Sequence, residues 1–167
     1  MSFIANTTIV SNFAAVGRLD VLHALLGEVY ISTEVYAETQ DGLMEGYDFY
    51  EGIESHLYPL ATNGWLRLTS LQGDDELRLF NDLPAALHRG EASCLAIAAR
   101  RSWAFLSDDA RARWAARELG VTLSGTLGVL AQAVQANLLS LDEANRLLGL
   151  MIQNGYRSPY PNLTEFS

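Results

Sequence analysis

Lysine is absent from this chain, and all eleven of its basic residues are arginine. The absence excludes a Walker A phosphate-binding loop, which depends on its lysine. It also excludes an enzyme that forms a Schiff base through a lysine amine, and a phospho-acceptor receiver domain, which combines paired aspartates with a lysine. Genome composition is the simplest explanation for the missing residue type.

Cysteine and histidine are scarce. Cys94 is the only cysteine, so the chain cannot form an internal disulfide, which fits a reducing cytoplasm. Its alanine-rich surroundings favour a packing role over a nucleophilic one. His23, His56 and His88 are scattered and show no metal-ligand spacing. The sequence also has no GxSxG or GxGxxG motif, which leaves carboxylate–metal chemistry or no chemistry.

Long hydrophobic runs are few. The N-terminus lacks a basic region followed by an apolar core, so we expect no signal peptide. Residues 121–141 carry no charge over about the length of a membrane span. Polar residues interrupt this stretch and no basic flank follows it, so we interpret it as mainly buried helix and expect no membrane partner.

The composition is that of a globular protein. The chain has 167 residues, which is long enough for one domain with a sizeable core. Its content of 49% hydrophobic and 19% charged residues is typical of a folded protein. The net charge of −9 argues against broad electrostatic attraction to nucleic acid or anionic lipid.

Hydrophobic periodicity predicts an alternation of short strands and helices. The expected strands are 3–5, 28–31, 65–71, 103–106 and 121–123. The expected helices are 9–16, 18–26, 34–39, 74–80, 91–101, 110–119, 124–138 and 140–153. Residues 41–64 are predicted to form an irregular acidic and aromatic excursion, and 154–167 a tail. The aromatic part of the excursion, 47–58, could stack on bases or form a dimer interface, but we expect it to cover its own domain's core. This order predicts a three-layer α/β domain with a central parallel sheet of about five strands. Trp65, Trp103 and Trp114 are expected in its core.

Polar side chains follow the predicted strands at what would be one edge of the sheet, where α/β proteins bind ligands. They are Asn6, Glu34, Glu38, Asp108, Asp109, Ser124 and Thr126, and Glu91 joins them if its helix begins at this edge. Carboxylate oxygens without histidine or cysteine form a ligand set for Mg²⁺ or Mn²⁺. Crowded carboxylates would repel one another unless a cation were bound.

Each of these residues also has a purely structural interpretation. Asp108 and Asp109 are suited to capping a helix N-terminus, and Asn6 to a turn or cap. Glu91 could be a first-turn acid and Glu38 a solvated helix residue. Arg113 and Arg117, four residues apart on one helix face, could hold a phosphate or form an ordinary solvated surface.

Four segments in order resemble a PIN domain, over nearly the whole chain. They are Ile4–Phe13, Val35–Glu38, Gly90–Ala98 and Leu106–Arg113. Ser124–Leu130 and Gly155–Ser158 resemble later parts of a bacterial group of PIN-like proteins related to VapC-type toxin ribonucleases. The resemblance implies an endoribonuclease that depends on Mg²⁺ or Mn²⁺, acts on single-stranded or structured RNA, and is often a homodimer paired with a small antitoxin protein.

The resemblance also assigns roles to residues. It implies catalytic Glu38, Glu91 and Asp109, with Asn6 and Asp108 as further metal ligands, Asp108 alternatively being a cap. Thr7, Arg113, Arg117, Ser124 and Thr126 are expected to contact substrate. Asn6 stands where the family has its first acidic ligand, and Gly125–Thr126 where it has a fourth. The alternative is therefore a catalytically impaired module that binds RNA or a partner protein.

Overall fold

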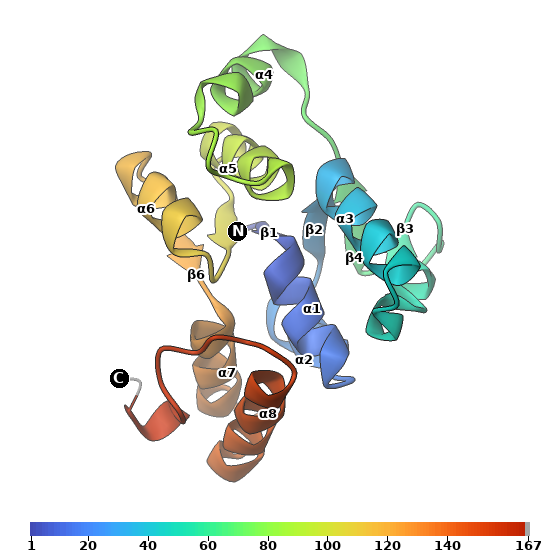
Figure 1. Ribbon diagram of the computed structural model, residues 1–167, viewed down its shortest axis with the longest axis vertical. Helices are drawn as coiled ribbons and strands as arrows, with labels where there is room; N and C mark the ends of the chain where they lie inside the picture. Colours follow the sequence, from blue (N-terminus) through green and yellow to red (C-terminus); the bar gives the residue numbers. More distant parts are fainter. Residues whose placement is uncertain (166–167) are drawn as a thin grey trace.

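The computed structural model describes residues 1–165 as an α/β domain built on one six-stranded sheet (Figure 1). All strand pairs are parallel, in the order β3-β4-β2-β1-β5-β6. The strands are β1 (Phe3–Ala5), β2 (Val29–Ser32), β3 (Leu57–Tyr58), β4 (Leu66–Thr69), β5 (Ala104–Leu106) and β6 (Leu123–Ser124).

Helices connect these strands and cover the sheet, which gives the expected three-layer architecture. The α-helices are α1 (Thr7–Ala15), α2 (Leu19–Leu26), α3 (Thr33–Met44), α4 (Gly73–Asp82), α5 (Arg89–Arg101), α6 (Ala110–Glu118), α7 (Thr126–Gln135) and α8 (Leu141–Gln153). Three short 3₁₀ helices are η1 (Asp48–Tyr50), η2 (Ile53–His56) and η3 (Leu163–Glu165). In Figure 1, α4 and α5 lie at one end of the molecule and α7 and α8 at the other.

The segment 41–64 contains the sixth strand, which the sequence pattern did not indicate. The end of α3, η1, η2 and β3 form most of it, and β3 pairs with β4. Tyr50, Ile53 and Leu57 are buried, so the segment covers its own domain's core as expected. The expectation for Trp114 is wrong: it lies on the outer surface of α6 and is 59% exposed, whereas Trp65 and Trp103 pack against the core.

The uncharged stretch 121–141 is divided between β6, α7 and the first residue of α8. Within residues 1–165, no single helix is both long and apolar enough to cross a membrane. The helices α1 and α2 reach the required length and composition only as a pair, and they are bent by 118°.

The strand order places the end of β1 at the switch point of the sheet. From β1 the chain passes to β2 and β4 on one side, and it later returns to β5 and β6 on the other. Parallel α/β sheets bind ligands in the crevice at the carboxyl ends of such neighbouring strands. Here that crevice lies between the residues that follow β1 and those that follow β5.

Candidate functional site

Asn6 joins the end of β1 to the N-terminus of α1. Its Oδ1 accepts from the backbone N–H of Ile9 at 3.2 Å, which caps the helix, and its Nδ2 donates to Ser107 Oγ at 2.9 Å. The residue is 1% exposed. The cap interpretation of Asn6 therefore holds, and both polar atoms of its side chain already have partners within the protein.

The two aspartates that follow β5 have different environments. Asp109 caps α6, because its Oδ2 accepts from the backbone N–H of Ala112 at 2.8 Å, and its Oδ1 accepts no hydrogen bond from residues 1–165. Asp108 accepts on both oxygens: from the backbone N–H and hydroxyl of Thr126, from Asn12 Nδ2 at 3.2 Å, and from the Tyr156 hydroxyl at 3.4 Å. Asp108 thus links β5 to α1, α7 and the segment after α8.

Glu38 reaches the same crevice from α3. Ser32 caps this helix through a 3.1 Å bond from the Val35 N–H, and Glu38 Oε1 accepts from the Thr7 hydroxyl at 2.6 Å. The carboxylate lies against the first turn of α5, at Gly90. A Cβ on Gly90 would stand 1.9 Å from Glu38 Oε1, so the glycine is what allows this close approach.

Glu91 is directed into the crevice by the way α5 crosses the strand ends. Cys94 donates to Ala5 O at 3.5 Å and Ser93 donates to Ser32 Oγ at 2.8 Å, which fixes α5 over β1 and β2. Glu91 Oε2 accepts from the His88 N–H at 3.3 Å. Burial raises the pKa of the Cys94 thiol to about 12, so this residue packs as a neutral thiol.

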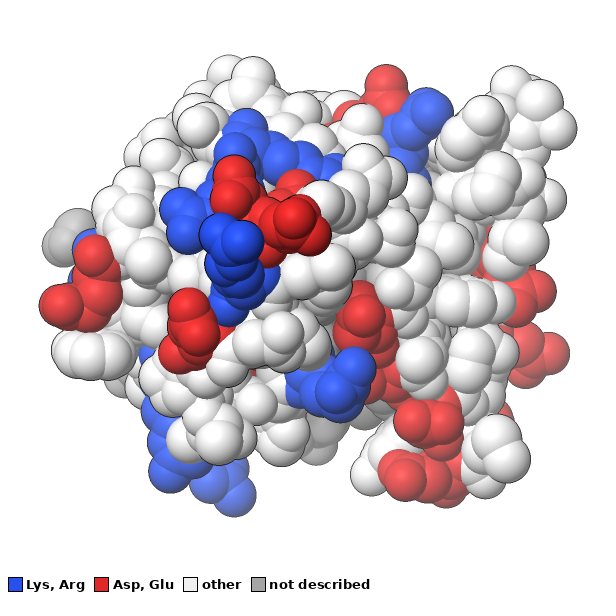
Figure 2. Space-filling view, turned by 90° about the horizontal axis from the view of Figure 1, so that it is seen from above, with Lys and Arg blue, Asp and Glu red and all other residues white. Residues whose placement is uncertain are grey.

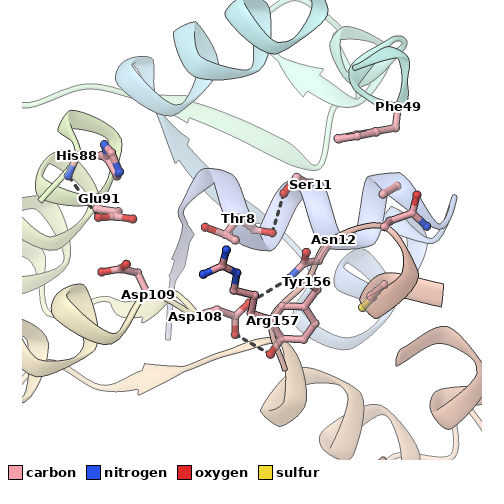
Figure 3. A pocket seen from close by; sticks show the side chains of 14 residues that line it. Thr8, Ser11, Asn12, Phe49, His88, Glu91, Asp108, Asp109, Tyr156 and Arg157 are labelled. Carbon is pink, nitrogen blue, oxygen red and sulfur yellow. Dashed lines mark hydrogen bonds between the residues drawn. The ribbon is translucent and has the colours of Figure 1, made fainter. Parts of the chain in front are cut away.

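Two neighbouring cavities bring these side chains together (Figure 3). The acidic cavity, of about 470 Å³, is lined by Thr8, Ser11, Asn12, Ala15, Phe49, His88, Glu91, Asp108, Asp109, Met151, Asn154, Gly155, Tyr156 and Arg157. The Glu38 cavity, of about 210 Å³, is lined by Asn6, Thr7, Thr8, Ser11, Glu38, His88 and Glu91. Glu91 belongs to both linings. Figure 3 shows its carboxylate and that of Asp109 directed toward the same space.

The carboxylates influence one another electrostatically. Burial raises the pKa of Glu91, and the charges of Asp109 and Glu38 raise it further, against the opposing effect of His88. Burial also raises the pKa of Asp108, although its hydrogen bonds from Thr126 and the charge of Arg113 act in the other direction. The repulsion at Glu91 is the kind that a bound cation would relieve.

The donor set suits a hard divalent cation. Glu38 Oε2, Glu91 Oε1 and Asp109 Oδ1 accept no hydrogen bond from the described part of the chain. Among residues 1–165, however, no three His, Cys, Asp or Glu side chains are grouped closely enough to hold a metal ion by themselves. The residues therefore fit an ion such as Mg²⁺, which keeps several waters and binds through one or two carboxylates, rather than a closed protein cage.

The expected substrate residues are dispersed. Thr7 lines the Glu38 cavity, where its hydroxyl is bonded to Glu38. Arg113 donates to Ser107 O at 2.9 Å and, with Ser124, lines a further cavity of about 470 Å³, named here the Arg113 cavity. Arg117 is exposed on α6. Thr126 is fully buried against Asp108 and Asn12, so in this structure its hydroxyl cannot reach a substrate.

Sequence reasoning missed several residues of the acidic cavity. Thr8, Ser11 and Asn12 recur at helical spacing along α1, and this polar stripe within an apolar helix was a usable signal. The histidines show no ligand spacing in the sequence, yet His88 lies beside Glu91 in both cavities. Arg157 comes from the predicted tail, and no periodicity indicates where a tail folds back.

Comparison with protein families agrees with this fold. A family model described as a PIN domain matches residues 2–166, so the chain belongs to the PIN domain family. Proteins of this family are generally nucleases and typically use divalent metals. No curated protein and no solved structure matches the chain.

Proposed function

We propose that this PIN domain is an endoribonuclease that depends on Mg²⁺ or Mn²⁺ and hydrolyses phosphodiester bonds of RNA. The observation that carries the proposal is the grouping of Glu38, Glu91 and Asp109 around two adjoining cavities at the switch point of the sheet. Each of these side chains keeps one carboxylate oxygen free of hydrogen bonds from the described residues.

The three carboxylates would have different roles, which depend on the cavity that each of them faces. Glu91 and Asp109 face the acidic cavity and would hold the cation, and Glu38 would add a negative charge from the adjoining cavity. When bound, Mg²⁺ or Mn²⁺ would supply Lewis-acid stabilisation of the charge that develops on the phosphate. Because protein ligands alone do not complete the coordination, water and a substrate phosphate would fill the remaining positions.

Cleavage of labelled single-stranded RNA tests the proposal. We expect the wild type to cleave in Mn²⁺ and to lose the activity in excess EDTA. Glu38→Ala and Asp109→Ala should each lower the rate by about 100-fold or more, because each removes a charge that the cation needs. Asp41→Ala is the matched control, since this exposed acid lies on the same helix as Glu38. Equal rates for all four proteins would contradict the proposal.

A second function, an RNA-binding module with an impaired site, is favoured by Asn6. Its amide brings no negative charge, and both of its polar atoms already have partners. Asn6→Asp keeps an oxygen for the α1 cap and adds a charge at the crevice. If the wild type is inactive and Asn6→Asp cleaves RNA in Mn²⁺, the impaired module is the correct description. Cleavage by the wild type excludes it.

A further inference from the structure

The segment that follows α8 is fixed against the end of β5. Gly155 adopts φ +107°, which favours glycine and turns the chain away from the helix axis. Tyr156 then donates its backbone N–H to Met151 O at 3.0 Å and its hydroxyl to Asp108 Oδ1 at 3.4 Å. These two bonds determine where the next residue, Arg157, emerges.

Arg157 emerges at the acidic cavity. Figure 3 shows its guanidinium directed into the cavity, on the side where Thr8 and Asp109 lie. Of the described residues in the lining, Arg157 alone carries a permanent positive charge. No ion pair or hydrogen bond from residues 1–165 engages this guanidinium, whereas Arg18, Arg67 and Arg101 are each paired with an acid.

Arg157 also borders the Arg113 cavity. That cavity shares Asp108, Tyr156 and Arg157 with the acidic cavity, so these three residues form the wall between them. An RNA strand that extends from the carboxylates of the acidic cavity toward Arg113 must pass this wall. Its phosphates would meet a chain with a net charge of −9, and so they need local positive charge beyond the metal ion.

We propose that Arg157 binds a backbone phosphate of single-stranded RNA, next to the phosphate that is cleaved, as the strand passes from the acidic cavity into the Arg113 cavity. The proposal rests on the nuclease function proposed above. A free guanidinium can bind phosphate oxygens through two parallel hydrogen bonds, which gives orientation as well as affinity. Arg157 is then a substrate-positioning residue, and the hydrogen bond between Tyr156 and Asp108 holds it at the cavity.

Binding and cleavage measurements on the full chain test this assignment. In a Glu91→Gln background, the affinity for a short labelled single-stranded RNA is measured in Mn²⁺ over a range of salt concentrations. We expect Arg157→Ala to weaken binding about tenfold, which corresponds to the loss of charged hydrogen bonds. It should also make the slope of log affinity against log salt concentration shallower by about one, the amount that one phosphate contact contributes. Arg157→Lys should keep the salt dependence and lose part of the affinity.

The matched control is Arg146→Ala, which removes the same charge from the exposed surface of α8 and should leave affinity and salt dependence unchanged. In the cleavage assay, with Glu91 intact, Arg157→Ala should raise KM about tenfold and change kcat little, because the contact exists before and during the reaction.

The outcomes separate this inference from the nuclease proposal. If the wild type cleaves RNA and Arg157→Ala behaves like Arg146→Ala, the assignment of Arg157 is wrong while the nuclease stands. If Arg157→Ala binds RNA or Mn²⁺ more tightly, Arg157 is a counter-ion of the carboxylates, which also overturns the assignment. If RNA is bound through Arg157 but never cleaved, the phosphate contact of Arg157 stands, while hydrolysis and the position of that contact beside a cleaved phosphate are refuted.

Discussion

Both oxygens of the Asp108 carboxylate accept hydrogen bonds, whereas Asp109 uses one oxygen to cap α6 and leaves the other open to the acidic cavity. At the scale of residues, this difference separates a structural acid from a candidate ligand. The sequence offered two adjacent aspartates with the same two interpretations, cap or ligand. It could not assign them, because the assignment depends on Asn12, Thr126 and Tyr156, which are distant in the chain.

Substitution of each aspartate by asparagine should separate the two roles. Asp109→Asn keeps a good N-cap and should change the free energy of unfolding by less than about 0.5 kcal/mol. It should lower the Mn²⁺-dependent cleavage rate by about 100-fold or more, because it removes a ligand charge. Asp108→Asn should cost about 1–3 kcal/mol of stability, since an amide nitrogen would face a donor. Urea unfolding and the cleavage assay measure both effects; a larger stability loss in Asp109→Asn would contradict the assignment.

At the scale of elements, the site depends on how closely α3 and α5 approach. Glu38 can lie against α5 only because residue 90 has no side chain. The sequence indicated that a glycine precedes Glu91, but the distance between two helices is a property of packing, and no local pattern encodes it. The same limit explains β3: two residues that pair with β4 are too few to show alternation.

Gly90→Ala should therefore damage the site more than the fold. The new Cβ displaces the flexible end of Glu38, which is a small structural cost, and alanine is better than glycine within a helix by about 0.5–1 kcal/mol. We expect unchanged or higher stability and a cleavage rate at least about tenfold lower. Gly149→Ala is the control, because its Cβ would have no neighbour within 4 Å; it should raise stability and leave cleavage unchanged. Full activity in Gly90→Ala would exclude Glu38 from the site.

A buried ion pair joins α4 to α5 and should make stability depend on pH. Glu76, 6% exposed, accepts from Arg101 at 2.6 Å. Burial alone would raise the pKa of Glu76, but the bonds from Arg101 and the Gln72 N–H lower it below 4.5. A lowered pKa means that this contribution to stability is complete above pH 4.5 and is lost as the pH falls through the folded-state value.

Glu76→Gln should accordingly lower the free energy of unfolding by about 1–3 kcal/mol at pH 7. The difference from the wild type should shrink as the solution is acidified below pH 4.5. Urea unfolding at a series of pH values measures it. A difference that stays constant with pH would show that the charge of Glu76 does not contribute.

At the scale of the whole molecule, the acidic net charge constrains how RNA could bind. On the end of the molecule that carries α4, basic and acidic side chains are interleaved rather than gathered into a basic face (Figure 2). Affinity for RNA would then depend on the cation and on single arginines at the cavities. Motif order predicted the family and the three-layer fold. The absence of broad attraction to nucleic acid stays a prediction from composition. The place of the C-terminal segment could not be predicted, because it follows from the turn at Gly155 and the bond between Tyr156 and Asp108. The homodimer and the antitoxin stay predictions from the resemblance.

Glu91 and Asp109 are proposed to hold one divalent ion in the acidic cavity, with the charge of Glu38 close to it in the adjoining cavity. Crystals soaked in Mn²⁺ and measured for anomalous scattering test it most directly. We predict a single strong peak in the acidic cavity, within coordination distance of Glu91 Oε1 and Asp109 Oδ1, with Glu38 bound directly or through a water. The peak should disappear in Asp109→Asn crystals. A cavity without manganese at saturating concentration, with the three carboxylates unchanged, would contradict the account.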